Sequence, residues 1–281
     1  LSPEEIDEAI LMAHVLGNTV HTSGPAPGVF ADTYDALVDE GYEHILSIHL
    51  SGELSGTVEA ARVGAQLSKA RVTVLDSRTI AGAYGHAALH AHKVADTCDT
   101  PEELAEIVTS ICAATDIYFY IPTLDALRRG GRVSPALAMV GQMFQIKPIG
   151  TISQGKLTYV ERPRTAARAL DRFVELTVQA CREHRHAAAL DASTDAVPGS
   201  DTPGEVVAVH HVGNAAQAVQ LYERVQRLLG EGSLSHSAGA STGSASGEGS
   251  VALNIPEFLV SSLPPVLSAH SGLGAVAMVV Y

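Results

Sequence analysis

Short apolar runs alternate with helical patterns over the first part of the chain, and this alternation limits the fold more than any other feature. Residues 44–50 and 71–75 are apolar and partly β-branched, as buried strands are, while residues 29–37 and 55–67 carry apolar side chains at helical spacing. Strands separated by helices pair in parallel, because the helix carries the chain back along the sheet. The pattern predicts a parallel-sheet α/β domain over residues 1–113.

The second part of the chain has a different pattern. Two strand-like runs flank a polar turn at residues 153–156, which indicates a β-hairpin and therefore antiparallel pairing. The other expected elements are a strand, a long amphipathic helix, a strand, a helix and a final strand, at residues 117–121, 165–181, 206–210, 215–229 and 275–281. We expect a C-terminal α+β domain over residues 114–281, with a mixed sheet of about six strands. Residues 191–204 and 231–250 have the composition of surface loops.

Charge is distributed unevenly along the sequence. Lys and Arg total 18 against 31 Asp and Glu, a net charge of −13. Nine basic and two acidic residues lie in segment 128–172, a net charge of +7, which leaves −20 for the remainder. A mostly acidic surface repels phosphate backbones, so we expect no nucleic-acid binding. Arg164, Arg168 and Arg172 are four residues apart and predict a basic stripe on one helix face. The usual explanation of such a stripe is a solvated face, but few acidic residues intersperse with it here, and it would alternatively hold an anion or dock an acidic partner.

Several classes of protein and site are excluded by what the sequence lacks. The three cysteines, Cys98, Cys112 and Cys181, are odd in number and form no CxxC pair, which argues against a disulfide framework and fits a reducing cytoplasm. No apolar run reaches the ~18 residues that span a bilayer. None of the 13 histidines forms an HExxH or HxxxH pattern with further ligands, so we expect no metal and no cofactor.

A proline- and glycine-rich stretch at residues 22–28 is the first candidate for ligand binding. Its composition excludes regular structure, so a stiff loop would present the hydroxyls of Thr22 and Ser23. The alternative is a connecting turn that caps the helix after it.

A second candidate, at residues 50–57, follows a predicted strand and opens a predicted helix. Ligands of parallel α/β sheets bind beyond the carboxyl ends of strands, and a helix N-terminus favours anions. There the hydroxyl of Ser51 or Ser55 would donate a hydrogen bond, and Gly56 would let a ligand approach the backbone. The alternative is that Ser55 only caps the helix. The segment lacks the lysine of a P-loop and the spacing of GxGxxG.

Seven short motifs follow one another along the chain: TSGPAP at residues 22–27, LSGT at 54–57, DS at 76–77, GGR at 130–132, IKPI at 146–149, RT at 164–165 and HSGLG at 270–274. Taken in this order, they resemble the motifs of the DegV family, bacterial fatty-acid-binding proteins. The resemblance implies a two-domain α/β protein that buries a long-chain fatty acid. It also implies a bacterial, cytoplasmic carrier that presents the acid to a separate fatty-acid kinase and is not itself an enzyme.

The resemblance also implies roles for individual residues. Thr22 and a serine of the second motif, Ser55 in preference to Ser51, would bind the carboxylate, and His270 would lie near it in a glycine-rich turn. The basic residues of the later motifs would dock the partner or hold the acyl phosphate; they are Arg132, Lys147 and Arg164. Members of the family begin with a strand and a Thr-Asp-Ser loop that this chain lacks, so either the chain is truncated or its numbering starts late.

Two other hypotheses remain open at this point. A small α/β enzyme could act on a phosphorylated or carboxylated metabolite through a Ser55–His270 pair, provided that the two side chains lie within hydrogen-bonding distance. Alternatively, the chain could be an adaptor whose basic segment, with Arg164 and Arg168, binds an acidic protein.

Overall fold

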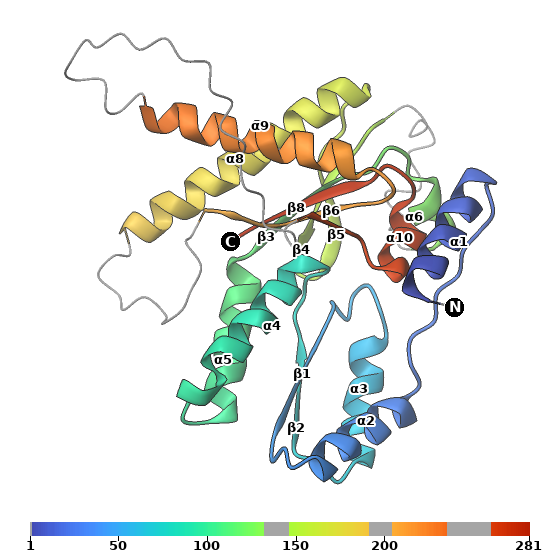
Figure 1. Cartoon of the computed structure of the whole chain (residues 1–281), viewed down its shortest axis with the longest axis vertical. Helices are drawn as coiled ribbons and strands as arrows, with labels where there is room; N and C mark the ends of the chain where they lie inside the picture. The colour runs from blue at the N-terminus through green and yellow to red at the C-terminus, as the bar shows by residue number, and fades with distance from the viewer. Residues whose placement is uncertain (1, 132–145, 191–203, 235–259) are drawn as a thin grey trace.

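Two β-sheets organise the molecule (Figure 1). The computed structural model describes residues 2–131, 146–190, 204–234 and 260–281. The small sheet pairs β1 (Ile45–His49) with β2 (Val72–Asp76) in parallel, and the larger sheet has six strands in the order β5-β4-β3-β8-β6-β7. The predicted α/β fold, with a parallel sheet followed by a mixed sheet of six strands, is confirmed.

The larger sheet is built around β3 and β8. Its strands are β3 (Asp116–Tyr120), β4 (Ile149–Ser153), β5 (Lys156–Glu161), β6 (Val206–His211), β7 (Val260–Ser262) and β8 (Val276–Val280). All pairs are antiparallel except β6 with β7. The predicted hairpin is confirmed as β4–β5, where Gln154 and Gly155 have φ values of +49° and +81°, as a two-residue type I′ turn requires. β7 has three residues, too few for its sequence to be distinctive.

Helices surround both sheets. They are α1 (Pro3–Val15), α2 (Pro27–Asp39), α3 (Thr57–Leu67), α4 (Gly82–Val94), the 3₁₀ turn η1 (Ala95–Thr97), α5 (Pro101–Ala114), α6 (Asp125–Arg129), α8 (Ala166–Leu190), α9 (Ala215–Leu234) and α10 (Pro265–Ser271). Side chains start two of them as the sequence predicts. Ser2 accepts a hydrogen bond from the Glu5 amide at the start of α1, and Thr100 accepts one from the Glu103 amide at the start of α5.

Two expectations about segment boundaries need correction, and a third is not tested. α8 begins at Ala166, so Arg164 precedes the helix and does not belong to a stripe on it. α9 continues to Leu234, so the first four residues of the loop predicted at 231–250 are helical. The rest of that loop and all but the last residue of the loop predicted at 191–204 lie outside the described residues.

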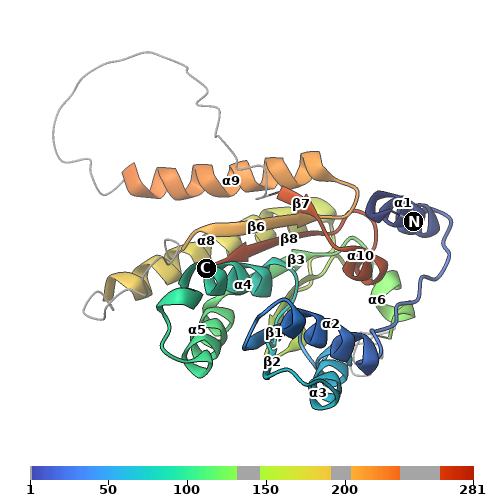
Figure 2. The ribbon, with the colours of Figure 1, turned by 60° about the horizontal axis from the view of Figure 1, so that its bottom comes forward.

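The faces of the six-stranded sheet have different neighbours. Helices α8 and α9 cover one face, which we call the α8–α9 face, and the small sheet with its helices lies on the opposite side (Figure 2). Successive side chains of a strand point to opposite faces. On β8 and the residue before it, Val276, Met278 and Val280 therefore pack with α8 and α9, while Ala275, Ala277 and Val279 belong to the opposite side.

Contacts across the chain join the N-terminal and C-terminal parts. The small sheet lies between the pair α2 and α3 and the pair α4 and α5 (Figure 1). α4 also packs against β6 and β8 of the larger sheet, and α1 packs against α10. The domain boundary that the sequence indicates near residue 114 falls between α5 and β3 and stays a prediction.

Candidate functional site

A cavity of about 610 Å³ lies against the side of the larger sheet that is opposite α8 and α9, which we now call the cavity face. Its walls come from β3, β8, α10 and the loops that precede α2, α3 and α4. Most of the lining is apolar and includes Ile117, Phe119, Ile121, Leu127, Leu157 and Leu263. The volume lies within the roughly 300–1,000 Å³ that is typical of small-molecule sites.

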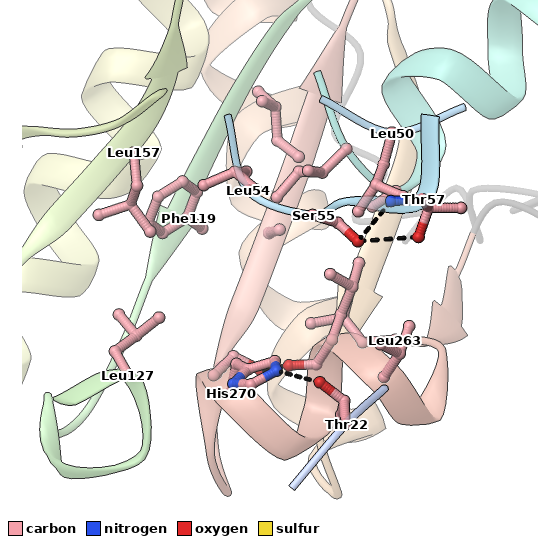
Figure 3. Close-up of a pocket in the computed structure, with 18 of the residues that line it drawn as sticks. Thr22, Leu50, Leu54, Ser55, Thr57, Phe119, Leu127, Leu157, Leu263 and His270 are labelled. Atoms are coloured by element: carbon pink, nitrogen blue, oxygen red, sulfur yellow. Dashed lines mark hydrogen bonds between the residues drawn. The ribbon is translucent and has the colours of Figure 1, made fainter. Parts of the chain in front are cut away.

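The first polar group in the cavity joins the two ends of the chain. Thr22, in the loop before α2, and His270, in the last turn of α10, are connected by a hydrogen bond of 2.8 Å between Oγ1 and Nε2 (Figure 3). The expectation that His270 lies in a glycine-rich turn is wrong, because Pro265 starts a short helix that contains it. Gly272 and Gly274 follow that helix with positive φ values, so the glycines turn the chain into β8.

The second polar group lies at the start of α3. Ser55 Oγ is 2.8 Å from Thr57 Oγ1 and accepts a hydrogen bond from the Thr57 amide at 3.3 Å (Figure 3). The N-cap residue of α3 is Gly56, so the alternative that Ser55 caps the helix is wrong by one residue. The first amides of a helix lack intrahelical acceptors and carry the positive end of its dipole. Hydroxyls and helix amides therefore meet at one wall of an apolar cavity.

The two polar groups belong to one site. Both Thr22 and Ser55 line the cavity, and a Cβ at Gly24 would lie 3.4 Å from Thr57 Oγ1, so the two loops touch. Ser23 and Gly56 line it as well. The structure thus brings together five of the six residues that the sequence predicted for the ligand.

Ser51 is the sixth, and the structure places it elsewhere. Its buried hydroxyl donates a hydrogen bond of 2.7 Å to the carbonyl of Gly155, in the turn of the β4–β5 hairpin. Arg78 donates to the neighbouring carbonyl of Gln154 at 2.8 Å. Ser51 therefore holds the hairpin of the larger sheet against the loops of the small sheet, and it is not among the residues that line the cavity.

The loop before α4 forms another wall, and His210 fixes it. His210 Nε2 accepts a hydrogen bond from the Gly82 amide at 3.0 Å, so its proton is on Nδ1, 3.1 Å from Ser261 Oγ. Burial, followed by the charge of neighbouring His211, lowers the His210 pKa to about 4. His210 is therefore neutral at neutral pH. Next to this anchor, Ala81 lines the cavity with a φ of +52°, which L side chains rarely adopt.

Gly130 is a residue of the site that sequence reasoning missed. It ends α6, and a Cβ there would lie 2.8 Å from Cε1 of His270 and still closer to Nδ1. The missing side chain is what lets the imidazole lie against α6. In the sequence, Gly130 is marked only by the glycine pair of the GGR motif, in which Arg132 was the residue predicted to have a function.

Two of the three predicted basic residues come close through the backbone, because the Lys147 amide donates to the carbonyl of Pro163, next to Arg164, at 2.7 Å. Arg132 lies outside the described residues. The ammonium of Lys147 donates to the carbonyl of Pro122 at 2.8 Å, and Arg164 is exposed. Arg172 forms ion pairs with Glu161 and Glu175, which neutralise the end of the expected stripe. The hydrogen bond from Arg172, with the charges of Arg172 and Arg168, holds the pKa of Glu161 below its usual value.

The alternative enzyme hypothesis required a Ser55–His270 pair. Instead, the hydrogen bonds described above join Ser55 to Thr57 and His270 Nε2 to Thr22. Within the described residues, no group of three or more His, Cys, Asp or Glu side chains is placed to hold a metal ion. Nor is any described helix long and apolar enough to cross a membrane.

Comparisons with known proteins agree with this fold. A family model described as "Uncharacterised protein, DegV family" matches residues 2–257. DegV domain-containing protein SCO2569 of Streptomyces coelicolor is 35% identical over 262 residues, which cover 93% of this chain and 78% of that protein.

Solved structures with the same fold include proteins that bind fatty acids. DegV of Bacillus subtilis, a fatty-acid-binding protein, matches with a TM-score of 0.72 at 22% identity, over 99% of this chain and 83% of the other. A DegV family protein of Thermus thermophilus, for which fatty acid binding is described, matches with a TM-score of 0.68 at 24% identity. The match covers 100% of this chain and 84% of the other. Together with the match over residues 2–257, these findings show that the chain belongs to the DegV family.

Proposed function

We propose that this protein binds a long-chain fatty acid, with the acyl tail in the cavity and the carboxylate at Thr22, Ser55 and His270. The observation that carries the proposal is the division of the cavity. Figure 3 shows Phe119, Leu127 and Leu157 along one side, and the hydroxyls of Ser55, Thr57 and Thr22 on the other. A fatty acid likewise has an apolar tail at one end and a polar carboxylate at the other. Relatives with this fold that bind fatty acids support the assignment.

The tail and the head group contribute differently. Each buried methylene contributes about 0.8 kcal/mol, so ten methylenes contribute on the order of 8 kcal/mol. A hydrogen bond to a charged carboxylate adds roughly 1.5–3 kcal/mol. The tail therefore sets the affinity, while Thr22, Ser55 and the amides at the start of α3 set the orientation and select for an acid. Ser23 and Gly56 belong to the wall around the head group, and Ser51 holds the hairpin.

Lipid extraction tests this proposal directly. Recombinant protein is denatured, extracted with organic solvent and analysed by mass spectrometry, and we expect a co-purified acyl chain. Thr22→Ala and Ser55→Ala should each weaken fatty-acid binding by about 10- to 100-fold, because each removes a hydrogen bond to a charged group. Thr109→Ala, at an exposed hydroxyl of α5, is the matched control and should change nothing. Repeated preparations without any acyl chain would contradict the proposal.

We further propose that the bound acid is presented to a separate fatty-acid kinase. Ser23 is exposed and also lines the cavity, so the head-group end adjoins solvent and a phosphoryl donor could reach it there. Exposed Arg164 belongs to the docking surface, together with Lys147 and Arg132.

Phosphoryl transfer can be followed by trapping acyl phosphate with hydroxylamine. The loaded protein and ATP should give no product until a fatty-acid kinase is added. Arg164→Glu should then lower product formation while the acyl content stays unchanged. Product without a kinase would mean that the chain is itself an enzyme, and full activity of Arg164→Glu would remove that residue from the docking surface.

A further inference from the structure

The apolar side of the cavity contains an unusual cross-strand pair. Phe119 on β3 lies directly opposite Gly150 on β4, and directly opposite Ala277 on β8. Phe119 lines the cavity and is 7% exposed. This large aromatic side chain thus has two of the smallest residues, Gly150 and Ala277, as its neighbours in the row, and Tyr159 on β5 lies beyond Gly150.

The ring occupies the space that a side chain at Gly150 would take. A Cβ at this position would lie 2.5 Å from Phe119 Cζ, closer still to Cε2, and 3.1 Å from the carbonyl oxygen of Thr158. Ordinary van der Waals contact begins near 3.4 Å, so the Cε2–Cζ edge of the ring lies where that side chain would be, against the backbone of β4. An aromatic side chain that covers a strand glycine is a known way of filling such a gap in a sheet.

This placement determines how much of the cavity stays empty. Phe119 is confined between β4 on one side and the cavity on the other. A ring that could not lie over β4 would move by at least about 1 Å, and the free space into which it would move is the cavity. The glycine at position 150 therefore keeps a large aromatic side chain out of the ligand's space.

We propose that the Phe119–Gly150 pair determines the length of the acyl chain that the cavity accepts. The inference rests on the proposed function, because it concerns the end of the same cavity that lies away from Thr22 and Ser55. The pair acts through the ring's position: Gly150 does not touch the ligand, and Phe119 forms the surface against which the tail ends. Neither residue belongs to the motifs that bind the head group.

Competition among fatty acids of different length tests the pair. The protein is equilibrated with an equimolar series of saturated straight-chain fatty acids, and the bound mixture is extracted and quantified. Gly150→Ala should shift the bound mixture toward shorter chains, by about fourfold for each methylene that is excluded. Phe119→Leu should shift it toward longer chains.

A double variant and a glycine control separate steric effects from loss of structure. Leucine lacks the ring atoms that meet the new Cβ, so Gly150→Ala/Phe119→Leu should bind chains at least as long as the wild type does. Gly85→Ala, on α4 with nothing within 4 Å of the added Cβ, should leave the mixture unchanged.

The outcomes distinguish this inference from the proposed function. If the wild type takes up no fatty acid from the series, the proposed function is wrong. If the wild type loads normally and the mixture is the same for Phe119→Leu or for a folded Gly150→Ala, the pair does not set chain length. If Gly150→Ala does not fold, Phe119→Leu and the double variant decide the question.

Discussion

The two faces of the central strand β8 differ in the size of the side chains that they carry. On the α8–α9 face, β8 presents Val276, Met278 and Val280, and α8 buries Phe173 completely against them. On the cavity face, the alternate positions are Ala275, Ala277 and Val279, and of these only the two alanines line the cavity. Protein interiors pack to nearly uniform density, so space for a ligand remains only where side chains are small. Alternate positions of one strand thus determine which face is filled and which holds a cavity.

The largest expected effect is a loss of stability when a large side chain is removed from the packed α8–α9 face. Phe173→Ala should lower the free energy of unfolding by about 3–5 kcal/mol, because it leaves a void among packed side chains. Denaturant titration measures the loss. Leu157→Ala, at a half-buried position that already borders the cavity, should cost less. Equal losses for the two variants would show that the faces are packed alike.

The next effect depends on pH and concerns the contact between His210 and the start of α4. The pKa of His210 is about 4 in the folded state against an ordinary 6.5, so the unfolded chain binds the proton more readily. Stability should therefore fall as the pH drops from about 6.5 toward 4, by up to about 3 kcal/mol from this residue. Unfolding titrations at a series of pH values measure the slope.

A variant isolates the contribution of His210. The pKa values of His211 and His49 are also lowered by burial, so acid destabilises the wild type through more than one histidine. His210→Gln keeps an acceptor for the Gly82 amide and removes the titration. The pH dependence should become shallower, and an unchanged slope would mean that the Gly82 contact does not require a neutral imidazole.

Filling the cavity should affect binding more than stability. Ala277→Leu places three further carbons in the cavity, so it should weaken binding of a long acyl chain at least about tenfold. The free energy of unfolding should change by less than about 1 kcal/mol, because the side chain enters empty space. Ala218→Leu, on α9 against the α8–α9 face, is the matched control and should cost about 1–3 kcal/mol through overpacking. If Ala277→Leu and Ala218→Leu lower the free energy of unfolding equally, the cavity face has no more free space than the α8–α9 face.

The fold was largely predictable because its elements have clear periodic patterns. Strand–helix alternation predicts β1 and β2, and the polar turn predicts the β4–β5 hairpin. The short elements α6, β7 and α10 were missed, since a few residues carry too little periodicity. The position of α1 against α10 depends on contacts between distant parts of the chain, which no local pattern contains.

The candidate site shows a similar limit at single residues. Ser51 and Ser55 lie four positions apart in one polar loop, and only the fold shows that Ser51 faces the β4–β5 turn while Ser55 faces the cavity. Gly130 and Gly150 contribute by having no side chain beside His270 and Phe119. A glycine looks the same in a sequence whether it serves a turn or makes room for a distant ring.

The smallest expected effect is an increase in stability at the cavity wall. Ala81 has a φ of +52° and a ψ of −137°, a conformation that costs a non-glycine residue about 1–3 kcal/mol. Ala81→Gly removes that cost but adds about 0.5–1 kcal/mol of backbone entropy, so a net gain of about 1 kcal/mol is expected in denaturant titrations. Ala83→Gly, two residues later inside α4, should instead destabilise the protein. A loss of stability in Ala81→Gly would contradict the presence of strain. A gain with unchanged fatty-acid content would show that the strained residue lies on the ligand's side of the sheet without contributing to its binding.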